Sequence, residues 1–218
     1  MAEIHTERNP HLAHHFEDLE QQQEAVTLGM WLFLATEIML FGGLFLVFQV
    51  YRIGYPEAFV AAAEHLQFLV AGVNTAVLLC SSFTIALAVH AAQTGNSRRA
   101  ALFLLATIVL GSIFLGIKGY EWYHEYEEAL VPGLRFIWEG APEHAGPAYI
   151  FFSLYFTMTG LHATHMIIGM VLLAAIAFMA WRNKFSAEYY APVELIGLYW
   201  HFIDVVWVFL YPVLYLLI

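Results

Sequence analysis

The stretch that decides the fold is residues 199–207, which read YWHFIDVVW. It lies inside a helix-sized apolar segment, residues 193–218, and places His201 and Asp204 close to the middle of that segment. An ionisable side chain at the centre of a bilayer costs about 2.5–3.5 kcal/mol on insertion scales. The sequence therefore predicts a membrane-spanning helix whose polar side chains face other protein.

Two more apolar segments carry ionisable residues at similar depth. Glu37 lies within the first segment, and His162 and His165 lie within the fourth. Intramembrane ionisable residues are rare and usually face the interior of a helical bundle. Their presence on three separate segments indicates an interior that serves a function or meets a partner.

Composition supports an integral membrane protein. Charged residues make up 12% of the chain, hydrophobic residues make up 61%, and the mean hydropathy is +0.68, whereas soluble domains contain roughly 25% charged residues. Since each span needs about 20 residues, the fold class is all-α: a bundle of five transmembrane helices over residues 28–218, preceded by an acidic, histidine-rich tail over residues 1–27. The predicted spans are residues 28–51, 66–92, 100–120, 149–181 and 193–218.

Charge and cysteine content exclude several classes of protein. The formal net charge is −10, and no basic patch is present to displace the counterions of a nucleic acid, so nucleic acid is not an expected partner. The single cysteine excludes an internal disulfide, a Cys-x-x-Cys redox pair and a covalent haem attachment.

The distribution of basic residues predicts the orientation, because cytoplasmic loops carry an excess of Lys and Arg. With five spans, the N-terminus shares one side of the membrane with the second and fourth connections, and this side has more basic residues than the other. The N-terminus is therefore predicted inside and the C-terminus outside. The N-terminal side carries Arg8, Arg98, Arg99, Arg182 and Lys184, and the opposite side carries Arg52, Lys118 and Arg135.

Glu37 is the first candidate functional residue. A carboxyl group at this depth is poorly solvated, which favours its protonated form. A protonated carboxyl group can donate a hydrogen bond and later release its proton, as a proton relay requires. The alternative is a neutral glutamate that is hydrogen-bonded to a neighbouring helix and holds the bundle together.

The second candidate is a polar seam between the fourth and fifth spans, formed by His162, His165, His201 and Asp204. The members of each pair are three residues apart and therefore share a helix face. Three interpretations stay open: a metal site with three imidazoles and a carboxylate, a haem site, or interhelical hydrogen bonding in which Asp204 fixes a histidine tautomer. Asn74, in the second span, is expected to form a similar interhelical contact.

Four segments, in this order, resemble subunit III of the haem-copper oxidases, the cytochrome c oxidase polypeptide III family. The resemblance covers roughly residues 28–217 and is closest to the short, five-helix bacterial type. A further match is Glu121, which is followed by two aromatic residues. The segments are WLFLATEIMLFGGLF (31–45), NTAVLL (74–79), GLHATHMIIG (160–169) and YWHFIDVVWVFL (199–210).

The resemblance implies an accessory subunit of a proton-pumping terminal oxidase in the bacterial inner membrane. It implies that haem and copper reside on partner subunits and none on this chain, that the chain packs directly against subunit I, and that subunit II and small subunits complete the complex. It also implies support of proton uptake into subunit I and binding of phospholipid. Glu37 matches the family's carbodiimide-reactive carboxyl, and Glu121 belongs to the interhelical polar contacts.

Several alternatives remain at this point. Longer family members have seven spans, with a lipid cleft between two groups of helices, and the two extra helices are missing here. Glu37, where quinol oxidases tend to have Asp, favours cytochrome c as the electron donor. The alternatives are a quinol oxidase subunit, a homologue associated with nitric-oxide reductase, and a stand-alone membrane metalloenzyme that uses the histidines and Asp204.

Overall fold

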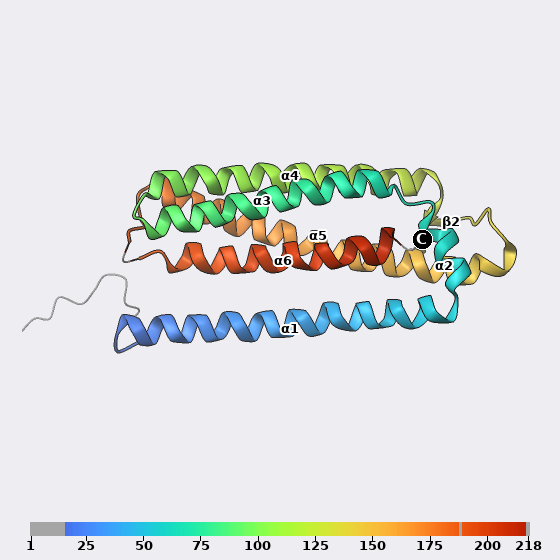
Figure 1. Cartoon of the computed structure of the whole chain (residues 1–218), viewed down its shortest axis with the longest axis horizontal. Coiled ribbons are helices and arrows are strands. Elements are labelled where there is room, and N and C mark those ends of the chain that lie inside the picture. Colours follow the sequence, from blue (N-terminus) through green and yellow to red (C-terminus); the bar gives the residue numbers. More distant parts are fainter. Residues whose placement is uncertain (1–15, 188, 217–218) are drawn as a thin grey trace, which may run out of the picture.

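The computed structural model describes residues 16–187 and 189–216, and in this part of the chain five long helices run side by side (Figure 1). All five are long and apolar enough to cross a membrane, which confirms the predicted five-helix membrane bundle. The long helices are α1 (Leu19–Gly54), α3 (Phe68–Gln93), α4 (Ser97–Glu127), α5 (Ala145–Trp181) and α6 (Ala191–Tyr215). The short elements are α2 (Pro56–Ala63), the antiparallel strands β1 (Leu130–Val131) and β2 (Arg135–Phe136), and the 3-10 helix η1 (Pro142–His144).

Helices α1 and α4 extend furthest beyond the predicted spans. α1 begins at Leu19, where the Asp18 side chain accepts a hydrogen bond of 2.7 Å from the backbone N–H of Gln21, so residues 19–27 of the predicted tail are helical. α4 continues to Glu127. Hydropathy marks only the part of a helix that lies in hydrocarbon, and a capped helix can continue beyond it into the polar interface. Residues 1–15 of the predicted tail lie outside the described residues.

The helices form a four-helix body with α1 lying along one side (Figure 1). α3 and α4 are sequence neighbours joined by a tight turn, in which Gly95 has a φ of +74°; glycine adopts this conformation without steric cost. α5 and α6 pack against this pair, and in the described part of the chain α1 packs mainly against α2, α5 and α6.

α1 meets the body along one narrow stripe. Leu34, Phe41 and Phe48 are buried, whereas most other apolar residues of this helix are exposed. Glu37 lies three residues after Leu34 and four before Phe41, which is the spacing of one helix face. The periodicity of α1 therefore turns Glu37 toward α5 and α6.

Trp200 connects all four helices of the body. Its indole ring occupies the space opposite two glycines: a Cβ atom on Gly111 of α4 would lie 2.9 Å from Trp200 Cη2, and one on Gly169 of α5 would lie 3.1 Å from Cε3. Its Nε1–H donates a 3.0 Å hydrogen bond to Oγ of Ser81 in α3. Glycine suits both positions, because a methyl group on Gly111 would overlap this large ring of α6 and one on Gly169 would press against it.

We expect Gly111→Val to reduce the free energy of unfolding by about 1–3 kcal/mol, because overpacking displaces a buried ring. Thermal unfolding of the purified complex in mild detergent measures this effect. Gly119→Val is the matched control on the same helix, since a Cβ there meets nothing within 4 Å. Equal unfolding temperatures for the two variants would contradict the assigned role of Gly111.

Candidate functional site

Glu37 and His165 form a contact between α1 and α5. Nε2 of His165 lies 3.0 Å from Oε2 of Glu37, and the two side chains are 12% and 14% exposed. Nδ1 of the same imidazole lies 2.8 Å from the carbonyl oxygen of Leu161. A carbonyl oxygen can only accept, so Nδ1 carries a hydrogen and Nε2 is the nitrogen that faces the carboxyl group. This arrangement allows one proton to reside on either the carboxyl group or the imidazole.

Neighbouring aromatic residues hold His165 in place. The Phe41 ring lies with its centroid 5.5 Å from that of the imidazole and also packs against Phe202 of α6. The Tyr199 hydroxyl donates a hydrogen bond of 3.1 Å to the backbone carbonyl of His165. The Glu37–His165 pair is therefore positioned by residues of α1, α5 and α6 together.

His162, one of the predicted seam residues, lies deeper and among aromatic rings. It is 1% exposed, and its ring centroid lies 5.6 Å from that of Phe114 and 5.0 Å from that of Trp207. Neither ring nitrogen has a hydrogen-bond partner within residues 16–187 and 189–216. Although His162 and His165 share a helix, only His165 reaches α1.

The second pair of the predicted seam does not pair directly. His201 Nδ1 lies 2.8 Å from the Ser82 hydroxyl of α3, and Asp204 is buried close to the same Ser82 side chain. The four residues thus do not converge on one point, and among the described residues no hydrogen bond joins Asp204 to a histidine. Among the described residues, no group of three or more His, Cys, Asp or Glu side chains is arranged to hold a metal ion. The metalloenzyme alternative therefore has no ligand set here.

Asn74 links α3 to α4. Its side chain is fully buried, and Nδ2 donates a hydrogen bond of 3.2 Å to the carbonyl oxygen of Phe114. On the next residue, the Thr75 hydroxyl accepts a 3.0 Å hydrogen bond from Nε1 of Trp207. These bonds connect the central helix α3 to α4 and α6.

Glu121 belongs to a buried cluster that the sequence did not reveal. Lys118, which the sequence analysis counted as a flanking charge, is 2% exposed, and its Nζ lies 3.1 Å from Oε1 of Glu121. The ammonium also donates to the hydroxyl groups of Tyr155 and Tyr215, and both hydroxyl groups donate to Glu121 Oε1. We call these four residues the Lys118 cluster.

Aromatic faces surround the ammonium of the Lys118 cluster. Nζ lies 4.7, 5.3 and 5.2 Å from the ring centroids of Tyr155, Trp207 and Tyr215, distances at which the ring quadrupole attracts a cation. The cluster binds α4, α5 and α6 together near the ends where α4 and α6 finish. The signal in the sequence was the spacing of three between Lys118 and Glu121, which puts opposite charges on one helix face.

Together the fold and these contacts define an integral membrane bundle whose buried polar groups join helices to one another. The sequence profile of the family "cytochrome c oxidase subunit III" matches residues 3–131 and 141–217. The chain belongs to this family, which confirms the prediction of a haem-copper oxidase subunit III and places the chain in an oxidase complex.

Individual relatives agree with the family assignment. The chain is 30% identical to quinol oxidase subunit 3 of Bacillus spizizenii over 190 residues, which cover 87% of this chain and 86% of the relative. It is also 30% identical to cytochrome c oxidase subunit 3 of Thermostichus vulcanus over 194 residues, with the same two coverages. The probable quinol oxidase subunit 3 of Staphylococcus aureus is 28% identical over 191 residues, which cover 87% of this chain and 88% of the relative.

We expect Lys118→Met to cost about 3–5 kcal/mol of stability, because it leaves the Glu121 carboxylate buried without its cation. The double variant Lys118→Met/Glu121→Gln should cost less than Lys118→Met alone, since no charge then remains unpaired. Thermal unfolding of the purified complex for both single variants and the double variant measures the coupling. A double variant at least as unstable as Lys118→Met would contradict the ion pair.

Proposed function

We propose that this chain is an accessory, non-redox subunit of a proton-pumping haem-copper oxidase in a bacterial inner membrane. It packs against subunit I, stabilises it, and supports proton uptake during aerobic electron transport, while haem and copper reside on the partner subunits. Membership of the subunit III family supports this proposal. So does the distribution of the buried histidines and carboxyl groups, which contact neighbouring helices instead of converging on one point.

The observation that carries the proton-related part is the Glu37–His165 contact of 3.0 Å. Two groups that can each hold a proton face one another, and each keeps a small exposed surface. In a low-dielectric environment, the neutral carboxyl–imidazole form and the ion-pair form are the two states available to such a pair. We propose that the pair takes up and returns one proton while the adjacent subunit draws protons from the inner side of the membrane.

The same proposal includes the orientation of the chain, with the N-terminus inside. The turn between α3 and α4 and the connection between α5 and α6 carry Arg98, Arg99, Arg182 and Lys184 at one end of the bundle. Lys118 is buried in its cluster, so it does not belong to a flanking loop. When it is not counted among the basic loop residues on the side opposite the N-terminus, the excess of Lys and Arg on the N-terminal side becomes larger.

A second candidate differs in the electron donor. The relatives include quinol oxidase subunits and a cytochrome c oxidase subunit at equal identity, so quinol is a supported alternative to cytochrome c. Glu37 favours cytochrome c, because quinol oxidases tend to have Asp at this position. Oxygen consumption by the purified complex with reduced cytochrome c, and separately with a short-chain quinol, distinguishes the two donors.

A hydrophobic carbodiimide should label Glu37 at neutral pH, because the reagent reacts with a protonated carboxyl group in an apolar setting. Glu37→Gln should abolish the labelling and reduce turnover modestly, and the haem spectrum of the complex should stay unchanged. Peptide mass spectrometry, steady-state oxygen consumption and an optical spectrum measure the three effects. Glu57→Gln, at an exposed carboxyl of α2, is the matched control and should keep the labelling at Glu37.

Two results would count against this assignment. If Glu37 is not labelled while the complex is intact, its carboxyl group does not hold a proton at neutral pH. If the purified chain alone bound stoichiometric haem or copper, the non-redox assignment would be wrong.

Orientation can be tested with single cysteines in a Cys80→Ser background. A membrane-impermeant maleimide added to intact spheroplasts should label Glu139→Cys, in the connection before α5, and leave Lys184→Cys, in the connection after α5, unlabelled. Both positions are exposed, and both should react once the membranes are lysed. The reverse pattern in spheroplasts would place the N-terminus outside.

A further inference from the structure

The buried face of α4 becomes ionisable over its last turns. From Ser97 to Phe114 its buried residues are all uncharged, and the buried residues that follow are Lys118, Glu121 and Glu125. Spacings of three and four residues keep these side chains on one helix face. α4 therefore carries one ammonium group and two carboxyl groups into the interior of the bundle.

Glu125 is enclosed without a hydrogen-bond partner. It is 0% exposed, and neither of its carboxyl oxygens has a partner within residues 16–187 and 189–216. It lies close enough to Lys118, Glu121 and Tyr215 to interact with them electrostatically. Glu125 thus adjoins the Lys118 cluster and yet is not bonded to it.

The Lys118 cluster has no donor left for Glu125. An ammonium group has three N–H donors, and Lys118 directs its donors to Glu121, Tyr155 and Tyr215. Each of the two tyrosine hydroxyl groups has one hydrogen and donates it to Oε1 of Glu121. Because the Lys118–Glu121 pair is already neutral, an ionised Glu125 would be a buried charge without a counter-ion, and the cost of such a charge favours the protonated acid.

We propose that Glu125 is a proton-binding site, which holds one proton beside the neutral Lys118–Glu121 pair and exchanges it through Glu128. Glu128 follows Glu125 by three residues, and its side chain is 39% exposed. Side chains at this spacing have Cβ atoms about 5–6 Å apart, a separation that one water molecule or a side-chain rotation bridges. In the outward transfer, the O–H bond of Glu125 breaks and an O–H bond forms on the Glu128 carboxylate.

Two imidazoles flank the exposed end of this path. Nδ1 of His65 lies 3.7 Å from Oε2 of Glu128, and Nδ1 of His124 lies 3.6 Å from Oε1. Both histidine side chains are partly exposed, and imidazole exchanges protons with water near neutral pH. Glu128 and its two neighbours therefore connect the buried carboxyl group to the aqueous surface.

The elements packed against this part of α4 add few titratable groups. α5 and α6 contribute the two tyrosines of the cluster and His162, which interacts with Lys118. α3 contains no Asp, Glu, Lys or Arg, and neither residue of β1 is titratable. The charges that act on Glu125 therefore come from its own helix, from Lys118, Glu121 and Glu128.

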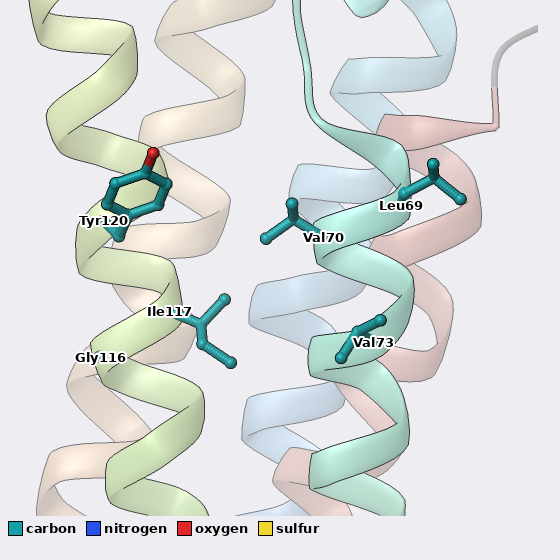
Figure 2. Close-up of a pocket in the computed structure, with 6 residues that line it drawn as sticks. All are labelled: Leu69, Val70, Val73, Gly116, Ile117 and Tyr120. Carbon is teal, nitrogen blue, oxygen red and sulfur yellow. The ribbon is translucent and has the colours of Figure 1, made fainter.

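The neighbouring face of α4 offers no polar route to the surface. There α3 and α4 line an apolar groove of about 470 Å³, and Figure 2 shows Val70 and Ile117 pointing toward one another across it. Apart from the Tyr120 hydroxyl, no lining side chain can donate or accept a hydrogen bond. A proton therefore leaves the buried face of α4 at its Glu128 end. The lining residues are Leu69, Val70, Val73, Gly116, Ile117 and Tyr120.

This site is separate from the Glu37–His165 pair, because Glu37 lies on α1 and Glu125 lies on α4. Only the side of the membrane that it serves rests on the proposed orientation, under which the end of α4 faces outside. A result at Glu125 therefore leaves the role of Glu37 to its own test.

Infrared spectroscopy of the intact complex at neutral pH tests whether Glu125 holds a proton. Glu125→Gln should remove one absorption band of a protonated carboxyl group, seen in the difference between the spectra of the unsubstituted and substituted complexes. Glu127→Gln is the matched control, because Glu127 is an exposed carboxyl at the same end of α4. It should remove no such band.

Transfer into heavy water tests the route. The band should move to lower frequency as O–D replaces O–H, and Glu128→Gln should slow this shift several-fold relative to Glu127→Gln. Glu128 is exposed and lies outside the cluster, so this measurement remains available if Glu125→Gln does not assemble.

Thermal unfolding of the complex distinguishes a protonated Glu125 from an ionised one. Glutamine has the shape of a protonated glutamate, so Glu125→Gln should not lower the unfolding temperature. Glu121→Gln should lower it, because Lys118 is then buried without its counter-ion.

Three outcomes would overturn the proposal. The first is that Glu125→Gln removes no band of a protonated carboxyl group. The second is that Glu125→Gln lowers the unfolding temperature as much as Glu121→Gln, which would make Glu125 an ionised partner of Lys118. The third is that the band shifts in heavy water at the same rate in Glu128→Gln and Glu127→Gln, which would place the route elsewhere.

Discussion

A polar side chain that lies in hydrocarbon has no water to bind, and several such side chains here find their partner on another helix. These contacts between helices organise much of the bundle. Asn74 reaches the backbone of α4, Trp200 reaches a serine of α3, His201 reaches another serine of α3, and Glu37 reaches α5. Apolar side chains alone would not fix which helix meets which, because lipid tails are as apolar as leucine and supply no hydrophobic force between helices. The directional contacts, together with the close approach that glycine permits opposite Trp200, select one packing among many.

The same constraint gives two different outcomes for the two acid–base pairs. In the Lys118 cluster, the ammonium and the carboxylate are each almost fully enclosed and are linked through two tyrosine hydroxyl groups. Such a cluster joins α4, α5 and α6, because its side chains are enclosed and hydrogen-bonded to one another. Glu37 and His165 keep 14% and 12% of their side chains exposed, and Glu37 lies on the least enclosed of the five spans, whereas His165 lies on α5. The proposed proton exchange needs access as well as a suitable pair of groups, and the contact between α1 and α5 is the less enclosed of these two sites.

The sequence was sufficient for the number and type of helices, since hydropathy and length report directly on hydrocarbon depth. The sequence was also sufficient to place Glu37 on the helix face that packs against the bundle, because Leu34, Glu37 and Phe41 are three and four residues apart.

The sequence did not indicate which side chain each buried polar residue contacts. His162 and His165 share a helix face at a spacing of three, yet a small rotation about α5 sends one ring toward α1 and leaves the other among Phe114 and Trp207. Lys118 was missed for another reason: a lysine near the end of a predicted span is usually a solvated flank, and only the tyrosines from α5 and α6, distant in sequence, turn its position into a buried cluster.

The position of α1 connects the two parts of the proposed function, stabilisation of a neighbouring subunit and support of proton uptake. Only 17% of its most apolar window is buried within this chain, against 56% for α6, so α1 has the largest free surface for a neighbouring subunit or for lipid. Its attachment to the body depends on the narrow stripe of Leu34, Phe41 and Phe48 and on the Glu37–His165 contact between the first two residues of that stripe. Under the proposed function, a partner subunit that packs against the outer face of α1 adjoins the helix that carries the Glu37 carboxyl group. The proposed stabilising role and the proposed proton-related role then share one helix.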